Sequence, residues 1–386
     1  MRKIIKALLA VPALFIVPVV RLISPFILIR FISLPSDRIG HFAGNTEMYL
    51  CHRDAGKYGD KTIDIFYCRD RVCNRQLKKM LGRCLRIIPY ARLMDSVNRL
   101  FPGWQRHTLT ELPSDRDTNG FYAKRPSHLF FTEEEKGRGR LALESLGVPK
   151  GAPYVCFHAR DAAYLDAVEP DKKWYYHNYE DVALNSYLSA AEELTRRGYY
   201  VIRLGAIVAR PLNTKNPMII DYATKERSDF LDIYLCANCE FFLASASGLS
   251  SVPLVFRKPI AWSNFVPLEY IPTWDSRGIL ILKKLKRRQE GRFLPFREIL
   301  DLGAGRFLHT EQYDKLGLEV IDNTPEEIAS LAIETQERLK GTWQNSEEDV
   351  ELQRRFWSIF RTGELHGDIA LKIGADFLRR NRELLD

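Results

Sequence analysis

The stretch that most constrains the fold of this chain is residues 228–265, where a buried strand is followed by a small-residue turn. Residues 241–244 are apolar at every position, which is typical of a strand covered on both faces. The run ends in the sequence SASG at 245–248, and residues 249–256 restart with a helical pattern. Backbone N–H groups and hydroxyls at such a turn can bind an anion. Any α/β unit also needs a polar turn at this point, so the turn alone leaves a structural role open.

The charge of the chain is unevenly distributed. The net charge is +8 over 386 residues, a length that favours two domains with additional segments. Residues 1–36 contain five basic residues and no acidic one, and residues 283–288 form a second basic run. Basic patches favour anionic lipid, phosphate-bearing substrates or nucleic acid as partners. No nucleic-acid-binding module is recognisable, so we expect no nucleic acid partner. The run at 283–288 could equally be a solvated surface loop.

The seven cysteines favour a reduced, cytosolic domain. Their number is odd, and several lie within apolar strand or helix patterns. Cys236 and Cys239 form a C-x-x-C pair, but there is no second pair to complete a zinc site. The pair also ends a predicted helix instead of starting one, unlike a thioredoxin motif. We therefore interpret both thiols as packing residues.

The N-terminal segment is apolar behind a basic start. Residues 7–20 are uninterrupted by charge, but they are fewer than the roughly 20 residues that a spanning helix needs. Arg21 follows the run, and no signal-peptidase site does. We predict that residues 1–24 are an uncleaved, membrane-associated segment at the cytoplasmic leaflet, peripheral or N-terminally anchored. The alternative is a helix packed on the protein itself, which the prolines at 12, 18 and 25 disfavour.

Residues 25–149 are predicted to form a first Rossmann-like domain. Strands at 26–34, 62–68 and 86–89 alternate with helices at 42–53 and 73–85, which predicts a parallel sheet. The loop at 35–41 follows the first strand and contains Arg38, Gly40 and His41, which we place on the acceptor side of a site. His41 could equally be a structural loop residue.

Residues 150–340 are predicted to form a second domain after a Pro/Gly linker at 149–153. Strands are expected at 154–157, 199–204, 241–244, 279–282 and 319–322. Helices are predicted at 185–197 and 325–339, and a capping box begins the second of them. Residues 341–386 are predicted to be closing helices that pack back on the domains.

The strand ends of the second domain carry the candidate chemistry. Neither G-x-G-x-x-G nor a P-loop is present. The D-x-D at 115–117 does not follow a hydrophobic strand, so we expect neither a metal nor another cofactor. Arg160 could clamp a diphosphate as a bidentate guanidinium. The candidate donor-binding residues are His158, Arg160, Gly205, Asp229, Ser245, Ser247 and Gly248.

Glycosyl transfer from a nucleoside-diphosphate donor needs a stabilised leaving group and a base for the acceptor hydroxyl. Arg160 and helix N-termini would stabilise the diphosphate. His41, Glu47 and Asp161 are the candidates for the catalytic base, and each has a structural alternative.

The motif His158-Ala159-Arg160 resembles the H-x-R motif of α1,6-fucosyltransferases and protein O-fucosyltransferases, whose arginine binds the donor diphosphate. Segment 229–247 is similar to a later motif of that group, in which an acidic residue opens a helix and serines follow the next strand. Fucosyltransferases often carry a second arginine beside the first, where this chain has Asp161. That departure argues against GDP-fucose as the donor.

Residues 241–267 resemble the strand–SG–helix–Pro element of heptosyltransferase-type enzymes, and 323–328 resemble the closing helix of many GT-B glycosyltransferases. From 38 to 360 the chain is similar to bacterial glycosyltransferases encoded with surface-polysaccharide genes. The resemblance implies a GT-B fold, with two Rossmann-like domains facing a central cleft and the donor site in 150–340. It also implies an inverting transfer from a nucleotide-sugar to a surface glycan or lipid-linked acceptor. The alternatives are a non-catalytic nucleotide- or polysaccharide-binding protein, an epimerase or hydrolase of the same donors, and a membrane scaffold.

Overall fold

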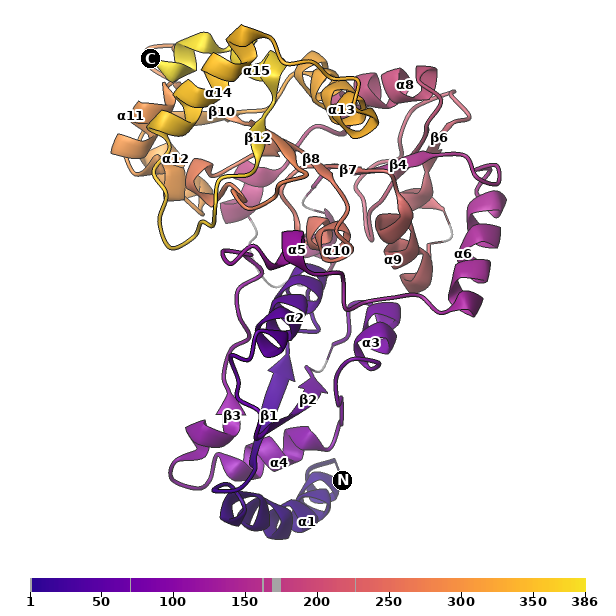
Figure 1. The fold of residues 1–386 in the computed structure, drawn as a ribbon, viewed down its shortest axis with the longest axis vertical. Helices are drawn as coiled ribbons and strands as arrows, with labels where there is room; N and C mark the ends of the chain where they lie inside the picture. Colours follow the sequence, from indigo (N-terminus) through magenta and orange to yellow (C-terminus); the bar gives the residue numbers. More distant parts are fainter. Residues whose placement is uncertain (1, 70, 162, 169–174, 226) are drawn as a thin grey trace. The chain divides into compact units, whose positions relative to one another are not determined.

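The computed structural model describes residues 2–69, 71–161, 163–168, 175–225 and 227–386, and it divides the chain into two compact units (Figure 1). Unit 1 comprises the chain up to Asp115 together with Arg125–Phe131. Unit 2 comprises Arg116–Lys124 and Thr132–Asp386. Both units are mixed α/β structures built on parallel sheets. Neither unit is one continuous piece of chain.

Unit 1 is a three-stranded parallel sheet with helices around it. The sheet order is β2-β1-β3, and β1 pairs with β2 along its whole length. The elements are α1 (Arg2–Leu22), β1 (Leu28–Leu34), α2 (Ile39–Asp54), β2 (Thr62–Cys68), α3 (Arg75–Leu81), α4 (Ala91–Asn98), the 3-10 helix η1 (Trp104–His107) and β3 (Thr108–Leu109).

Two predictions for unit 1 need correction. The third strand is β3, whereas the predicted strand at 86–89 makes only two backbone hydrogen bonds with β2, both with Phe66. Pro89 has no N–H with which to extend that pairing. Helix α2 begins at Ile39, three residues earlier than predicted. Gly40 and His41 therefore lie in the first turn of a helix, and Arg38 is its N-cap residue.

Helix α1 packs on the core of unit 1 through one face. Ala13, Val17 and Val20 are buried against apolar side chains of β1, β2 and α4. Within the described part of the chain, no helix combines the length and the apolar character needed to cross a membrane.

Unit 2 is organised around a seven-stranded, wholly parallel sheet of order β12-β9-β8-β7-β4-β5-β6. Its strands are β4 (Tyr154–His158), β5 (Tyr200–Arg203), β6 (Ile219–Asp221), β7 (Phe242–Ala244), β8 (Ile260–Phe265), β9 (Ile279–Leu282) and β12 (Lys372–Ile373). Strands β10 (Lys284–Arg287) and β11 (Leu318–Ile321) form a separate antiparallel pair. The strand predicted at 319–322 therefore exists, but it lies outside the main sheet.

Helices cover both faces of this sheet. Figure 1 shows α8 (Leu188–Arg196) and α13 (Pro325–Lys340) packed together on one face, with α9 (Asp229–Asn238) and α10 (Ser251–Val255) on the other. The remaining helices are α5 (Phe121–Lys124), α6 (Glu133–Ser145), α7 (Ala163–Val168), α11 (Phe296–Asp301), α12 (Thr310–Lys315), α14 (Glu347–Ile359) and α15 (Ala375–Arg380). The capping box predicted for the helix at 325–339 is formed at Thr324, and a second capping box at Thr132 opens α6.

The described part of unit 2 begins closer to the N-terminus than the domain boundary predicted from the sequence. The sequence predicts a domain boundary at 149/150, whereas in the structure all residues from Thr132 onward belong to unit 2. The reason is α6, which packs on α9: a Cβ added at Gly139 would lie 2.0 Å from the ring of Tyr234. Within the D-x-D, Asp115 is the last residue of the first piece of unit 1, whereas Arg116 and Asp117 belong to unit 2. Asp117 caps α5 by accepting from two backbone N–H groups, and Arg116 donates to three backbone carbonyls.

Replacing Gly139 with alanine should destabilise unit 2 by about 1–3 kcal/mol, the usual cost of overpacking a filled core. The matched control is Gly137→Ala, whose added Cβ comes no closer than 3.9 Å to another group. That change should stabilise the same helix by up to about 1 kcal/mol, because alanine is the better helix former. Urea unfolding followed by circular dichroism measures both. Equal effects of the two substitutions would contradict the α6–α9 contact.

Candidate functional site at the switch point of the sheet

The strand order of unit 2 reverses between β4 and β7. The chain runs outward from β4 through β5 to β6, then returns to β7 and continues outward through β8 and β9. The loops that leave β4 and β7 therefore diverge at their carboxyl ends. Ligands of open α/β sheets bind in the crevice outside such a switch point. The geometry of the sheet thus indicates that a ligand site would lie at the loops after His158 and Ala244.

These two loops are joined by hydrogen bonds. The backbone N–H of Arg160 donates to Oγ of Ser245 (3.1 Å), and the N–H of Ser245 donates to the carbonyl of His158 (3.3 Å). Ser245 is fully buried, so its hydroxyl fixes the backbone at Arg160. The structure therefore brings together Arg160 and Ser245, two residues that the sequence predicted to share a site.

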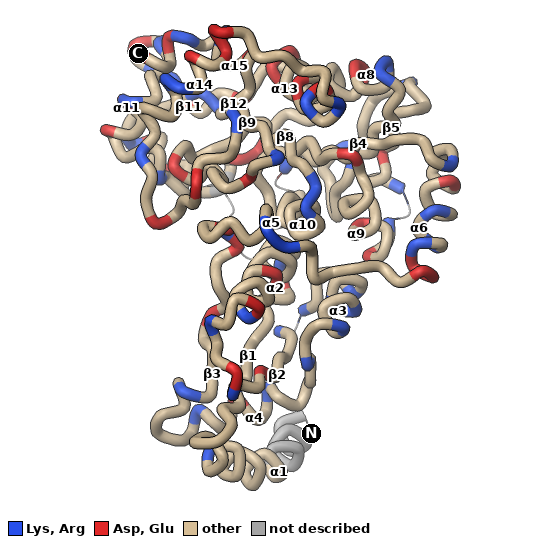
Figure 2. The backbone as a smooth tube through the Cα atoms, viewed as in Figure 1, with Lys and Arg blue, Asp and Glu red and all other residues tan. Residues whose placement is uncertain are grey.

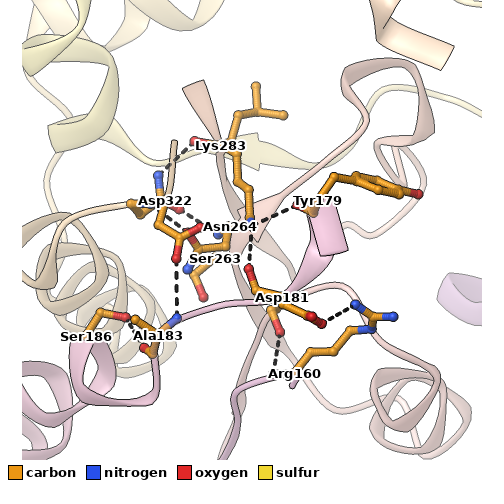
Figure 3. Close-up of polar contacts among 12 residues, drawn as sticks. Arg160, Tyr179, Asp181, Ala183, Ser186, Ser263, Asn264, Lys283 and Asp322 are labelled. Atoms are coloured by element: carbon orange, nitrogen blue, oxygen red, sulfur yellow. Dashed lines mark hydrogen bonds and ion pairs between the residues drawn. The ribbon is translucent and has the colours of Figure 1, made fainter. Parts of the chain in front are cut away.

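The guanidinium of Arg160 lies between two carboxylates, and Figure 3 shows its contact with that of Asp181. Its Nη1 is 2.7 Å from Oδ1 of Asp181, and its Nε is 3.3 Å from Oε2 of Glu180. The Arg160 side chain is only 12% exposed. Burial raises the pKa of Asp181 to about 6, against the opposing effect of Arg160 and Lys283. Burial likewise raises the pKa of Glu180. The charge of Arg160 is thus neutralised by groups that ionise less readily than usual.

Lys283 fixes the segment that carries these carboxylates. It directly follows β9, and its ammonium donates to the carbonyls of Tyr179 (2.9 Å) and Asp181 (2.7 Å). It also forms an ion pair with Asp322 (2.8 Å), which accepts from the N–H of Ala183. The side chain is 2% exposed, and burial lowers its pKa despite these carboxylates. Lys283 therefore holds residues 179–183 over the carboxyl ends of the strands.

The floor of this region is a polar layer at the end of β8. Ser263 shares a hydrogen bond with the hydroxyl of Tyr187 (2.8 Å), whose ring stacks on Phe157 of β4. Asn264 has a positive φ of 51° and exchanges two 2.6 Å hydrogen bonds with Asn323. Such a backbone conformation is tolerated best by glycine and asparagine. These contacts make the sheet edge beneath Arg160 rigid.

Three other predicted residues near this edge have structural contacts. Nδ1 of His158 lies 3.0 Å from the carbonyl of Leu204, and burial lowers the pKa of its ring. Asp161 accepts from the N–H of Ala163 in its own loop and from the N–H of Ala209 in the loop after β5. Gly205 is required for packing, because an added Cβ would lie 2.6 Å from Val208.

The turn after β7 leads into a helix, as predicted. A 3-10 helix, η5 (Gly248–Ser250), precedes α10, which has only five residues. Oγ of Ser247 lies 3.3 Å from Oγ of Ser250, and Gly248 is exposed. Val252 and Pro253 of α10 are buried. The helix predicted at 249–256 is therefore present as η5 followed by α10, with its first turn in the 3-10 form.

Asp229 opens α9, as predicted, with Ser228 as the N-cap residue. Its carboxylate lies 3.9 Å from the guanidinium of Arg227. The neighbouring Asp232 also pairs with Arg227, and it accepts from the hydroxyl of Tyr222 (2.9 Å). The acidic residues at this helix start therefore bind Arg227.

The candidates in unit 1 lie on α2. His41 is exposed, and its Nδ1 lies 3.1 Å from Oδ1 of Asn45. Glu47 is 1% exposed, and its Oε1 lies 3.1 Å from Nδ1 of His128. Its burial is incompatible with the predicted role as a base that reaches an acceptor hydroxyl. Of these residues, only His41 stays accessible.

Glu47, Cys51 and His128 are also the one group in the described part of the chain whose ligand atoms are close enough to hold a metal, all within 4.8 Å of one another. The other nitrogen of His128 lies 2.9 Å from Oδ2 of Asp54. Burial alone would lower the pKa of His128, but contacts with Cys51, Glu47 and Asp54 outweigh it and raise the pKa to about 10. A charged imidazolium between two carboxylates accounts for this arrangement.

Sequence reasoning missed Glu180, Asp181 and Asp322, and it treated Lys283 as part of a surface run. A signal for Lys283 was present, because a lysine directly after a fully apolar strand is placed at the carboxyl edge of the sheet. The 175–183 segment lacks a strong helix or strand pattern, so nothing in the sequence linked its carboxylates to Arg160.

Comparisons with known proteins give only distant similarities. No family model matches the sequence, and neither does a curated protein. The structure is similar to a glycosyl transferase family 9 protein from Veillonella parvula, with 12% identity, a TM-score of 0.45, and coverage of 81% of this chain and 97% of the other. It is also similar to the ADP-heptose LPS heptosyltransferase II of E. coli, with 15% identity, a TM-score of 0.38, and coverage of 66% and 90%. Similarities this low carry no argument about what this chain does.

Proposed function

We propose that unit 2 binds a nucleotide-sugar and that the protein is a glycosyltransferase of GT-B type. The observation that carries the proposal is the placement of Arg160 beside Ser245 at the switch point between β4 and β7. A diphosphate at this edge would meet a guanidinium, serine hydroxyls and the backbone of the loop after β7. Each of these groups is a common phosphate ligand.

In this proposal the donor diphosphate displaces Glu180 and Asp181 from Arg160 and takes their place on the guanidinium. The leaving nucleoside diphosphate is then stabilised by Arg160 without a metal, and the transfer is inverting. His41 is the candidate base for the acceptor hydroxyl. The acceptor is a surface glycan or its lipid carrier at the cytoplasmic face of the inner membrane.

The test is calorimetric titration of the full chain with UDP-, GDP-, ADP-, CMP- and dTDP-sugars, followed by transfer and hydrolysis assays. Arg160→Ala should weaken binding of the preferred donor by about 10- to 100-fold, because a hydrogen bond to a charged group contributes about 1.5–3 kcal/mol. The control is Arg196→Ala, an exposed arginine of α8 that pairs with Glu193. Equal titration of parent and Arg160→Ala would refute the donor-binding role. Binding without transfer or hydrolysis would instead favour a non-catalytic binding protein.

Donor affinity should rise as the pH falls from 7.5 to 5.5. Asp181 has its pKa raised to about 6, so it becomes neutral across this window and releases Arg160. The charged groups that face it are Arg160, Lys283, Glu180 and Asp161. A nucleotide-sugar suits the experiment because each of its phosphates is substituted at two oxygens and therefore lacks the second ionisation of a phosphate monoester near pH 6.

The control for this pH dependence is Asp181→Asn, which should bind the donor equally well at both pH values and at least as tightly as the parent at pH 5.5. A parent affinity that stays constant or falls between pH 7.5 and 5.5 would exclude competition between Asp181 and the donor.

A further inference from the structure

Helix α1 is apolar on the face that points away from unit 1 as well as on the packed face. Ala13, Val17 and Val20 form the packed face and are at most 6% exposed. At about 100° per residue, positions 15 and 22 lie roughly opposite position 13 on the helix. Phe15 is 73% exposed and Leu22 is 78% exposed. The side chains that make up this outer face of α1 are Val11, Phe15, Val19 and Leu22, continued by Phe26 after the helix.

The outer face is held in place by unit 1, so it is a fixed surface and not a loose tail. Arg21 donates from Nη1 to Asn98 (2.9 Å) and from Nη2 to the carbonyl of Pro102. Its guanidinium also lies over the ring of Phe101. A helix that is apolar all round is normally covered on all sides. Unit 1 covers one side of α1 through the Ala13 face and leaves the opposite side to solvent.

The charged residues of the segment that carries the outer face are all basic. Residues 1–36 contain no Asp or Glu. Arg92 of α4 and Arg106 of η1 are exposed; α4 packs beside α1, and Arg106 donates to the carbonyl of Ser24 shortly after α1 (3.4 Å). Figure 2 shows Lys and Arg on these segments of unit 1. An apolar strip with a cationic border complements a bilayer whose headgroups are anionic.

We infer that the outer face of α1 inserts into the interfacial layer of a membrane that contains anionic lipid, with α1 lying in the plane of the membrane. The apolar side chains from Val11 to Phe26 enter the acyl boundary, and the arginines contact lipid phosphates. This inference deepens the proposed function, because it brings the chain to the surface where a lipid-linked acceptor would lie. It does not depend on which nucleotide-sugar unit 2 binds.

The experiment is cosedimentation of the full chain with vesicles of phosphatidylcholine alone and with about 30% phosphatidylglycerol added, since surface potential grows with anionic lipid. The parent should partition at least tenfold more strongly onto the anionic vesicles. The variant Phe15→Glu/Leu22→Glu should lose at least tenfold of that binding. The matched control is Leu141→Glu, an apolar residue of α6 that is 68% exposed. It should bind vesicles like the parent.

Two outcomes would overturn the inference. The first is vesicle binding by Phe15→Glu/Leu22→Glu that equals that of the parent. The second is a lipid-free dimer of the parent that this variant abolishes while vesicle binding is unchanged, which would mean that a second copy covers the face. Circular dichroism checks that the variant folds, and its nucleotide-sugar titration reports on unit 2 separately. Loss of vesicle binding with intact donor binding, or the reverse, therefore distinguishes failure of the two proposals.

Discussion

Replacing His128 by leucine is expected to lower the free energy of unfolding of unit 1 by about 3–5 kcal/mol, the usual cost of removing one partner from a buried ion pair. Glu47 is 1% exposed, and the ring of His128 lies 3.1 Å from its carboxylate and 2.9 Å from that of Asp54. Leucine fills a similar volume but leaves the Glu47 carboxylate in the core without its cationic neighbour. Urea unfolding measures the loss, and hydrogen exchange over 42–54 assigns it to α2.

The control is His41→Leu, which changes an exposed histidine of the same helix. It should alter stability by no more than about 0.5 kcal/mol, as is usual for surface substitutions. If both variants lose the same stability, the paired imidazolium of His128 is not what stabilises unit 1.

The effect of His128 should also depend on pH. Its pKa is raised from 6.5 to about 10 in the folded chain, so the folded state binds the proton more tightly than the unfolded state. The stabilisation is therefore complete below pH 6.5 and is lost as the pH rises toward 10. The difference in free energy of unfolding between the parent and His128→Leu should therefore decrease as the pH rises from 6.5 toward 10.

Replacing Lys283 by methionine should lower the free energy of unfolding of unit 2 by about 3–5 kcal/mol, because it too removes one partner from a buried ion pair. The ammonium of Lys283 is buried and bonds two carbonyls and the carboxylate of Asp322. Methionine keeps the length and apolar volume of the side chain but removes all three contacts. Residues 179–183 would lose their attachment to β9, so their amides should exchange faster with solvent. Thermal unfolding and hydrogen exchange measure the two effects.

Lys286→Met is the matched control, because Lys286 lies on β10 in the antiparallel pair and is less buried. It should change stability little and leave exchange at 179–183 unaffected. Unchanged exchange at 179–183 in Lys283→Met would mean that other contacts position Glu180 and Asp181.

The elements that the sequence predicted well are those with strong local signals. Residues 62–68 and 279–282 are β2 and β9 with the predicted bounds. The first is rich in β-branched and aromatic residues between Lys61 and Arg69, and the second is a fully apolar run between Gly278 and Lys283. Thr132 and Thr324 cap helices through side-chain bonds that are encoded within four residues. Parallel pairing of the strands in unit 2 follows from the alternation of strands and helices.

The elements that failed depend on contacts distant in sequence. The third strand of unit 1 is chosen by pairing of Phe31 and Ile32 with 108–109, which no local pattern reveals. The assignment of α6 to unit 2 depends on the fit of Gly139 against Tyr234. The sequence placed Arg160 near Ser245 because both follow strands of one sheet. It could not place Asp181 on Arg160, because that ion pair is made by a segment without regular periodicity.

The discontinuity of both units has a consequence for dissecting the protein into fragments. A fragment that ends at Asp115 would contain every strand of unit 1 but would lack His128, the partner of Glu47. A fragment that begins at Thr132 would lack Arg116, which donates to the carbonyls of Tyr270, Ile271 and Leu365. The exchanged pieces 116–124 and 125–131 are adjacent in the chain but belong to different units. A fragment that contains all of unit 1 must therefore extend to Phe131, and one that contains all of unit 2 must begin at Arg116. Each would carry a piece of the other unit as an internal segment without its native partners.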